Sequence, residues 1–453
     1  MATLQAVSAP TPLRERVASA AWRTLAILVL FYLLSLLDRQ LLSMLIQPIK
    51  ADLHLDDTEI GFLQGIAFVL FYSVMGLLLA WAVDRYSRQV MVCIGVVVWS
   101  LSTVACGLAR SFGDLFGARL MVGFGEAVVG PAASSLIGGL FPRSRLALAT
   151  GIYYTASGAG SLIAFSVGGW LTDQFTARGG LDFPAVGHLK PWQAVFVLAG
   201  LAGLVFAPVA FAMANPKPPP PGQTPAQAAA GRERLIDFVR RRGALVACHA
   251  LAFGILNMCC YAAIAWTPAY LIRTFHTPLS TVGVVMGASY GVSCAIGQLL
   301  WGYVIDRMIR RGITDAHYRL FSILVPIGIP FAVAAYTIPD FTVGAFLICL
   351  IWIIMLPQGP MQSAMLLCTP AHLRGRVSAA AGLASGILAI GLTPFLIGAM
   401  NDHVFHDETK VGWSIAIFMA VFGLIGTGIL LIARPLLSRA VREDAEQAAA
   451  EAA

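Results

Sequence analysis

The chain has 453 residues, of which 58% are hydrophobic and only 12% are charged. A soluble domain has about a quarter of its residues charged, so this composition excludes an ordinary soluble protein. The apolar stretches are about 20 to 28 residues long, which is the length of a bilayer-spanning helix rather than of a barrel strand. The composition therefore predicts an all-α membrane protein.

Twelve apolar stretches follow one another along the chain, six before and six after a proline-rich basic linker. We therefore expect twelve transmembrane helices in two six-helix bundles. The expected spans lie near 22–49, 58–83, 89–109, 114–140, 146–172, 192–213, 244–273, 278–305, 317–338, 341–368, 371–400 and 413–434. The expected parts are an N-terminal tail (1–21), the first bundle (22–213), a linker with an amphipathic helix (214–243), the second bundle (244–434) and a C-terminal tail (435–453).

The positive charges fall mainly on one side of this arrangement. Most of the 30 Lys and Arg residues lie in the two tails, the linker and every second loop. The positive-inside rule then places both termini in the cytoplasm, and this placement explains the net charge of +7 without a nucleic acid partner. Loops rich in Arg and poor in Lys, without an N-glycosylation site, favour a bacterial inner membrane. We expect a monomer.

An internal repeat relates the two halves. The loop AWAVDRYSRQ follows the second span, and the loop GYVIDRMIRR follows the eighth, so that Asp84 and Asp306 take equivalent places. Arg145 and Arg374 likewise precede the fifth and eleventh spans, at nearly the same separation along the chain. Parallel repeats of this kind enclose a substrate site between them. We expect these loops to form a cytoplasmic gate that pairs in the outward-open state, with a purely topological role as the alternative. The gate residues are Asp84, Arg85, Arg88, Arg145, Asp306, Arg307 and Arg374.

With these loops, the twelve spans and the sequence RLMVGFGE in the fourth span, the chain resembles the major facilitator superfamily. Residues 30–170 resemble the spinster branch more narrowly, through LSLLDRQLLSMLIQPIKADL, RLMVGFGEAVVGPAASSL and ALATGIYYTASGAG. This resemblance implies alternating-access transport of lipids such as lysophospholipids or sphingoid phosphates, driven by a proton gradient and without another cofactor. The organic anion:cation symporter branch shares the D-R pair and the G-E…P-A pattern and remains an alternative. The fifth span lacks the Pro-containing glycine motif of family antiporters, which leaves the direction of coupling open.

Four ionisable residues fall inside the first and fourth spans. Counted at 1.5 Å per residue, Asp38 and Glu126 lie about 17 Å below the outer boundary, with Arg119 about 10 Å further out. An apolar setting favours the neutral form of a carboxyl group, and a neighbouring arginine favours the charged form. We therefore expect Asp38 and Glu126 to carry protons, and Arg39 and Arg119 to bind the anionic group of a substrate. An ion-pair cluster that only joins the two spans is the alternative.

The second half has no strong charge inside its spans. Asn257 and Tyr261 share a helix face, and together with Gln358 and Gln362 they are expected to line the cavity. Core hydrogen bonding is the alternative for Asn257 and Tyr261. A charged half that faces an apolar half suits an amphiphilic, lipid-like anion. A symporter of small organic anions and a non-transporting sensor on a transporter fold are the competing functions.

The motifs of several other protein classes are missing from the sequence. It contains no P-loop, no HExxH and no convincing triad, which argues against ATP as the energy source and against an enzyme. The eight cysteines fall in apolar segments without the spacing of metal ligands, so no metal site is expected.

Overall fold

The computed structural model describes residues 18–184, 186–214, 235–355, 363–365, 367–370 and 373–452. In this part of the chain, ten helical stretches are long and apolar enough to cross a membrane. Two more helices occupy the places of the expected fifth and tenth spans, namely α8 (Arg143–Ala177) and α14 (Phe341–Ile354). The all-α class is confirmed, and a short antiparallel hairpin of two strands adds to the helices.

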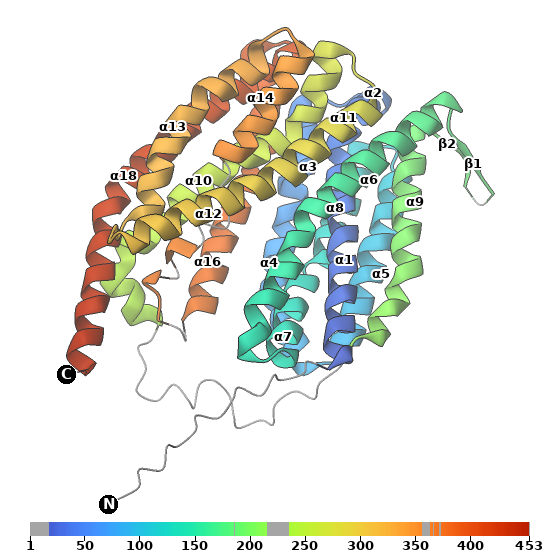
Figure 1. Cartoon of the computed structure of the whole chain (residues 1–453). Coiled ribbons are helices and arrows are strands. Elements are labelled where there is room, and N and C mark those ends of the chain that lie inside the picture. The colour runs from blue at the N-terminus through green and yellow to red at the C-terminus, as the bar shows by residue number, and fades with distance from the viewer. Residues whose placement is uncertain are drawn as a thin grey trace, which may run out of the picture.

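The first half forms the bundle coloured blue to green in Figure 1. Its second span is divided into two helices at Gly65, and its fourth span is divided into two helices after Glu126. Its elements are α1 (Ser19–Met44), α2 (Ile46–Leu53), α3 (Asp57–Gln64), α4 (Ile66–Arg85), α5 (Arg88–Gly107), α6 (Phe112–Glu126), α7 (Val129–Leu140), α8, β1 (Leu181–Phe183), β2 (Gly187–Leu189), α9 (Pro191–Phe206) and the 3₁₀-helix η1 (Ala207–Ala212).

The second half forms the bundle coloured yellow to red. Two of its described spans, the eighth and the eleventh, contain π-helical turns, which are rare in proteins and often occur at functional sites. Its elements are α10 (Leu235–Phe275), α11 (Leu279–Met286), η3 (Gly287–Ser293), α12 (Cys294–Arg310), α13 (Ala316–Thr337), α14, α16 (Arg374–Gly386), η4 (Ile387–Leu392), α17 (Thr393–Met400), η5 (Asn401–Phe405), η6 (Glu408–Lys410) and α18 (Val411–Ala452).

The break in the fourth span has a local cause. Pro131 has no N–H to donate to the carbonyl of Ala127, and its ring crowds that carbonyl. The helix α6 therefore ends at Glu126, and α7 resumes at Val129. As a result, Glu126 lies at an interruption inside the span rather than within a continuous helix.

The expected linker helix is only partly described, because residues 215–234 lie outside the described part of the chain. From Leu235 the chain is helical and continues directly into the seventh span, with one non-helical residue at Arg242. Arg242 is buried and bonds to Asp444 near the end of α18, with its Nη2 2.5 Å from Oδ1. This ion pair joins the end of the linker to the last helix.

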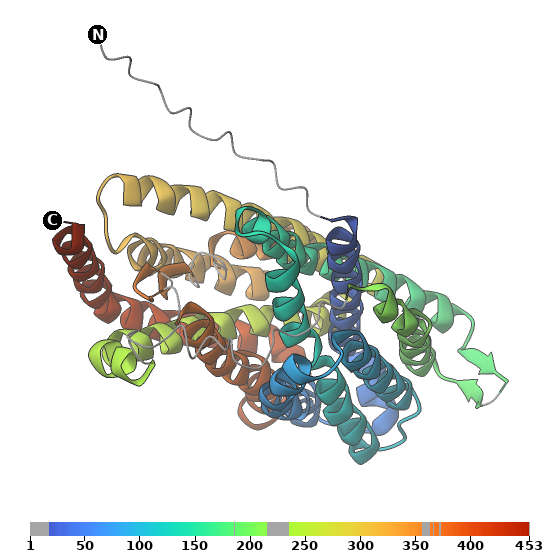
Figure 2. The same cartoon turned by 90° about the horizontal axis from the view of Figure 1, so that it is seen from below.

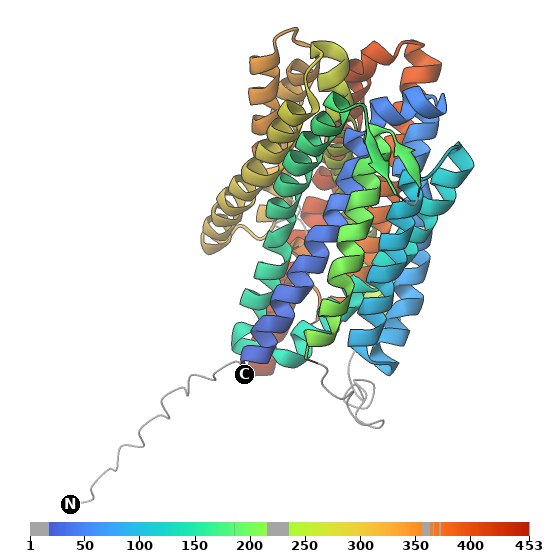
Figure 3. The same ribbon diagram turned by 90° about the vertical axis from the view of Figure 1, so that its right-hand side faces the viewer.

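The molecule has two distinct ends. The terminal end, where α1 begins and α18 ends, is at the bottom of Figure 1; the opposite end, which we call the closed end, carries α2, the start of α11 and the β hairpin. Seen from the terminal end, the two halves lie side by side (Figure 2). Seen from the first half, α1, α5 and α9 stand nearly parallel to one another (Figure 3). The ribbons of the two halves converge toward the closed end.

At the closed end, each half caps a helix of the other half. Asp402 of the second half accepts hydrogen bonds from the backbone N and the Oγ1 of Thr58 in the first turn of α3, both at 2.6 Å. Asp173 of the first half accepts one from the backbone N of Ser280 in α11, at 2.9 Å. The N-cap residue of α11, Pro278, makes no side-chain cap of its own. The helix therefore obtains this acceptor from the other half.

These two caps are equivalent positions of the internal repeat. Thr58 and Ser280 are separated along the chain by the same interval as the loop aspartates that revealed the repeat in the sequence. Asp173 and Asp402 are separated by the same interval as the two arginines that precede the fifth and eleventh spans. The repeat thus preserves a reciprocal contact between the halves as well as a loop motif.

Backbone touches backbone beside each cap. A Cβ atom on Gly398 would come within 2.1 Å of the carbonyl oxygen of Asp57, and one on Gly169 would come within 2.3 Å of that of Leu279. The repeat relates these two contacts by the same pair of intervals that relates the caps. Helices of opposite halves therefore approach closely at both places, and a side chain larger than that of glycine would not fit at either one.

We call each of these two places, where a cap and a backbone contact join the halves, a seam. A buried ionic cluster holds the halves together at the seam that contains Asp57. Asp57, which is fully buried, accepts two hydrogen bonds from Arg273, at 2.6 and 2.8 Å. The Nδ2 of Asn401 lies 2.9 Å from the same carboxylate, and so does the Nζ of Lys50. Lys50 also contacts Glu408 at 2.5 Å. Since Arg273, Asn401 and Glu408 belong to the second half, the cluster resists separation of the two halves at this end.

We expect Asp402→Ala to loosen the closed end, because Thr58 would lose its cross-half acceptor, and we expect adding Asp173→Ala to loosen it further. The readout is a cysteine placed at Ser43, which is only 3% exposed in this conformation. In a background without the eight native cysteines, a membrane-impermeant thiol reagent added on the closed-end side should label it several-fold faster.

The matched control is Asp340→Ala. Asp340 caps the backbone N of Val343 at 2.8 Å, but both residues belong to the second half. Loss of a helix cap by itself costs about 1 kcal/mol, and both variants incur that loss. Equal labelling rates in the Asp340 and Asp402 variants would show that the cross-half cap does not hold this end shut.

Candidate functional site

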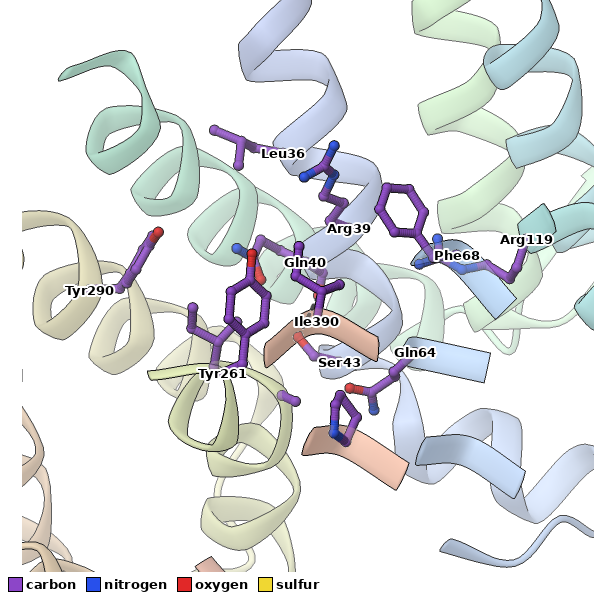
Figure 4. Close-up of a pocket in the computed structure, with 13 residues that line it drawn as sticks. Leu36, Arg39, Gln40, Ser43, Gln64, Phe68, Arg119, Tyr261, Tyr290 and Ile390 are labelled. Atoms are coloured by element: carbon purple, nitrogen blue, oxygen red, sulfur yellow. Dashed lines mark hydrogen bonds between the residues drawn. The ribbon is translucent and has the colours of Figure 1, made fainter. Parts of the chain in front are cut away.

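A pocket lies between the two halves, and its empty volume, which includes space open to the surface, is about 610 Å³. The first half contributes arginine, glutamine and serine side chains to the wall, whereas the second half contributes mainly aromatic and aliphatic ones (Figure 4). The lining residues are Leu36, Arg39, Gln40, Ser43, Gln64, Phe68, Arg119, Tyr261, Ile264, Ala265, Tyr290, Ile390 and Pro394.

The residues of α1 that line the pocket all lie on one face of the helix, because they follow the helical spacing i, i+3, i+4 and i+7. Arg39 lies on this face, whereas the preceding residue, Asp38, is rotated by about 100° around the helix. Asp38 faces α5 and is buried there, and Thr103 donates from its Oγ1 to Oδ2 of Asp38 at 3.0 Å. Two neighbouring charges in the sequence therefore belong to different interfaces.

Arg39 forms a buried ion pair with Glu126. The Nε and Nη2 atoms of Arg39 lie 2.7 and 2.6 Å from Oε2 of Glu126, and the Oγ of Ser35 donates to the same oxygen at 2.7 Å. The other carboxylate oxygen, Oε1, is buried and has no hydrogen-bond partner among the described residues. One oxygen of Glu126 thus receives three donor groups, while the second is left without any.

Arg119 is a buried cation that no described carboxylate pairs with. It is 2% exposed, and its Nε finds no hydrogen-bond partner in the described part of the chain. Its Cζ lies 5.5 Å from the centre of the Phe68 ring, and that of Arg39 lies 4.7 Å from the same centre (Figure 4). A cation–π contact offsets only part of the cost of burying a charge. Arg119 therefore presents donors that a ligand in the pocket can satisfy.

Gln64 offers a second unsatisfied donor in the same wall. It ends α3, and its Nε2 is buried without a hydrogen-bond partner among the described residues. An amide N–H and a guanidinium that both lack acceptors favour a ligand that carries acceptor oxygens. The residue types of the first-half wall thus suit an anion, and no group of described side chains could hold a metal ion.

The second-half residues expected in the cavity have different positions. Tyr261 lines the pocket, together with Tyr290 on the π-helical turn η3. Asn257 does not line it, because it lies one helical turn away and its Nδ2 donates to the Oγ of Ser385 at 2.8 Å. This bond fits the alternative of core hydrogen bonding, and a role of Asn257 in lining the wider cavity stays a prediction. Gln358 and Gln362 lie outside the described residues.

The residues of the predicted gate lie at the terminal end. Arg88 is buried and donates from its Nε to the Oγ of Ser135 at 3.0 Å, within the first half. The side chain of Asp84 lies outside the described part of the chain. The gate residues are expected to pair with one another only when this end is shut. Their role as a gate stays a prediction. The five exposed members are Arg85, Arg145, Asp306, Arg307 and Arg374.

Sequence reasoning missed several polar residues of this region. Ser35 and Thr103 bind the two buried carboxylates, and Gln64 lines the pocket. Ser35 could have been found, because it lies four residues before Arg39 and so shares its helix face. The positions of Thr103 and Gln64 depend on how α5 and α3 are rotated toward α1, for which the sequence carries no comparable signal.

Comparisons with known proteins agree on one family. The sequence model described as Major Facilitator Superfamily matches residues 28–394. The chain is 25% identical to an MFS-type efflux pump of Mycolicibacterium smegmatis over 94% of this chain and 95% of that protein. It is 24% identical to the hexuronate transporter of Bacillus subtilis, over 61% of this chain and 63% of the relative. It is 29% identical to protein spinster of Drosophila melanogaster, over 36% of this chain and 27% of the relative.

A solved structure shares the fold over nearly the whole chain. It is a bacterial homologue of the human lysosomal transporter spinster, in an inward-facing and unoccupied conformation. The TM-score is 0.77 at 23% identity, and the alignment covers 94% of this chain and 97% of that one. Together, the matches confirm the family resemblance seen in the sequence.

We expect the Arg39–Glu126 pair to behave as one energetic unit. Removing one partner of a buried ion pair leaves a buried charge and costs about 3–5 kcal/mol. Arg39→Gln alone should therefore lower the thermal unfolding midpoint of the purified protein strongly, and Glu126→Gln should lower it as well. The double variant Arg39→Gln/Glu126→Gln should recover part of the loss, since it leaves no unpaired charge.

The control for this cycle is Arg110→Gln, which removes an exposed arginine from the α5–α6 loop. It should leave the unfolding midpoint nearly unchanged, as most surface substitutions do. A double variant whose loss equals the sum of the two single losses would show that the two side chains do not interact energetically.

Proposed function

Because this chain belongs to the Major Facilitator Superfamily, whose members are transporters and not enzymes, we propose that it is a proton-coupled secondary transporter of an amphiphilic, lipid-like anion. In the proposed cycle, the pocket between the halves opens alternately at the closed end and at the terminal end. The driving force is the proton gradient, without another cofactor.

The observation that carries this proposal is the unpaired guanidinium of Arg119 opposite an apolar wall. An anionic group on the substrate would supply the acceptors that Arg119 and Gln64 lack. An arginine fork matches the geometry of a phosphate or a carboxylate. The opposite wall includes Ile264, Ala265 and Ile390, which would contact the apolar part of the same molecule. An amphiphile satisfies both walls, whereas a neutral sugar would leave the arginine unpaired.

Glu126 is proposed as the principal proton carrier, with Asp38 as the second. Burial favours the neutral form of a carboxyl group, and a neighbouring guanidinium favours its charged form. In this conformation Arg39 holds Glu126 at 2.6 Å. An anionic substrate that drew Arg39 away would leave Glu126 buried without a cation, which favours uptake of a proton. Substrate and proton would then be coupled through Arg39.

The proposed orientation follows from the positive charges. With the terminal end in the cytoplasm, the closed end faces outward, and this conformation is inward-facing. The expected site of action is a bacterial inner membrane, and the expected working unit is a monomer. The predicted gate of Asp84, Arg145, Asp306 and Arg374 would then pair in the opposite, outward-facing state.

A symporter of small organic anions is the second candidate. The similarity to a hexuronate transporter supports it, and the same arginines would bind a carboxylate as well as a phosphate. The two candidates differ in what contacts the second-half wall, because a hexuronate has no alkyl chain. A non-transporting sensor would bind a ligand and accumulate none.

The proposal is tested by uptake into proteoliposomes that contain the purified protein, with and without an imposed pH gradient. We expect a lysophospholipid to be moved faster when the gradient is present, and a hexuronate to be moved poorly. Faster movement of the hexuronate would favour the second candidate. Binding without movement of either compound would favour the sensor.

Two variants assign the roles within this assay. Glu126→Gln should remove the pH dependence of transport while the protein stays folded in the membrane, because a glutamine cannot exchange a proton. Arg119→Gln should weaken substrate binding by roughly tenfold or more, the effect of losing a charge-assisted hydrogen bond. Unchanged proton coupling in the Glu126 variant would overturn its assignment as the carrier.

A further inference from the structure

A second pocket lies on the second half at the terminal end, between the start of α13 and residues 431–442 of α18. It is separate from the central pocket and shares no residue with it. Its empty volume, open to the surface, is about 770 Å³. The lining residues are Gly312, Ile313, Thr314, Asp315, Arg319, Leu431, Arg434, Pro435, Ser438 and Arg442.

The charges of this pocket do not balance. Three arginines line it, against the single carboxylate of Asp315. Arg434 donates from its Nε to Asp315 at 2.8 Å, and Arg319 lies 3.1 Å from the same carboxylate. Burial raises the pKa of Asp315, but the hydrogen bonds from Arg434 and Arg319 lower it below its usual range, so the group is ionised at neutral pH. One negative charge thus faces three positive ones, which include Arg442.

Arg442 is the arginine with spare donors. It is exposed, and no described carboxylate forms an ion pair with it, since the neighbouring acids Glu443 and Asp444 contact Arg242 instead. It lies eight residues, or about two turns, after Arg434 on α18. Together the two side chains leave several guanidinium N–H groups around one hollow, and these would be satisfied by an anion with several acceptor oxygens.

An apolar track continues from this pocket toward the middle of the membrane. On α13, Ile323 and Ile327 follow Arg319 at intervals of four residues, and they are 52% and 50% exposed. On α18, Leu431 lines the pocket and is 50% exposed, and Leu424 lies seven residues before it on the same face and is 58% exposed. The basic hollow therefore opens onto surface that suits hydrocarbon chains.

We propose that this pocket binds the headgroup of an anionic phospholipid, with its acyl chains along the exposed faces of α13 and α18. The phosphate would accept hydrogen bonds from Arg442 and Arg434, for which the planar guanidinium is the better partner than an ammonium group. The pocket lies where apolar helix faces give way to arginines, which is the level of lipid headgroups in a bilayer. A soluble phosphate ester would use the arginines but leave the apolar track without a partner.

The test is lipid binding to the purified full-length protein, measured by titration with native mass spectrometry. Phosphatidylglycerol and phosphatidylcholine with identical acyl chains are compared, and glycerol phosphate serves as the headgroup without chains. We expect phosphatidylglycerol to bind most tightly. Arg442→Gln should weaken it roughly tenfold, the effect of one lost charge-assisted contact, without disturbing the contacts of Asp315.

The matched control is Arg310→Gln, which removes another exposed arginine of the terminal end that does not line the pocket. It should leave binding of phosphatidylglycerol unchanged. Arg119→Gln should also leave it unchanged, which separates this site from the proposed substrate site. Equal binding of the two lipids, equal binding of glycerol phosphate, or an equal loss in the Arg310 and Arg442 variants would each overturn the proposal.

Discussion

The two halves of this transporter are joined at the closed end by contacts that involve the backbone itself. Asp173 and Asp402 each satisfy a backbone N–H at the start of a helix in the opposite half. Gly169 and Gly398 let the backbones touch one turn away. Opening this end must leave two helix starts without these acceptors and must also disperse the cluster around Asp57. These costs have to be offset by new contacts elsewhere, for which the charged loops at the terminal end are the proposed source.

The two seams between the halves resemble each other, but the two walls of the pocket do not. The internal repeat relates cap to cap and glycine to glycine by constant intervals along the chain. The polar wall of the pocket, by contrast, comes mostly from the first half, where Arg39 is paired with Glu126 and Arg119 has no carboxylate partner among the described residues. In the proposed cycle, the movement depends on the duplicated parts, while recognition depends on residues that the second half lacks. This division agrees with a substrate whose ends differ in chemistry.

The sequence predicted the features that arise from local signals. The lengths of the apolar stretches predicted the spans, and the charged loop motifs indicated the repeat. Asp38, Arg39, Arg119 and Glu126 were conspicuous because charges are costly inside a bilayer. The partners of these residues were not predictable, since they depend on how each helix is rotated. Counting residues from the span ends placed Asp38 and Glu126 at the same depth, but it could not show that Glu126 forms an ion pair with Arg39.

The closed-end cluster was missed for a related reason. Lys50 and Arg273 lie at the ends of spans, where a charge looks like an ordinary loop residue. Asp57 begins a helix and is fully buried only because the other half covers it. The same holds for the caps from Asp173 and Asp402, whose role depends on contact between segments far apart in the sequence.

In the proposed cycle, one end of the molecule opens as the other closes. Paired spin labels test it most directly, in a background without the eight native cysteines. One pair, at Tyr86 and Arg311, spans the terminal end without replacing a residue of the predicted gate, and the other, at Arg110 and Lys410, spans the closed end; all four positions are exposed. Adding a lysophospholipid or lowering the pH should shorten the first distance in the same fraction of molecules that lengthens the second. Two distances that stay fixed under all these conditions, or that lengthen together, would contradict the account.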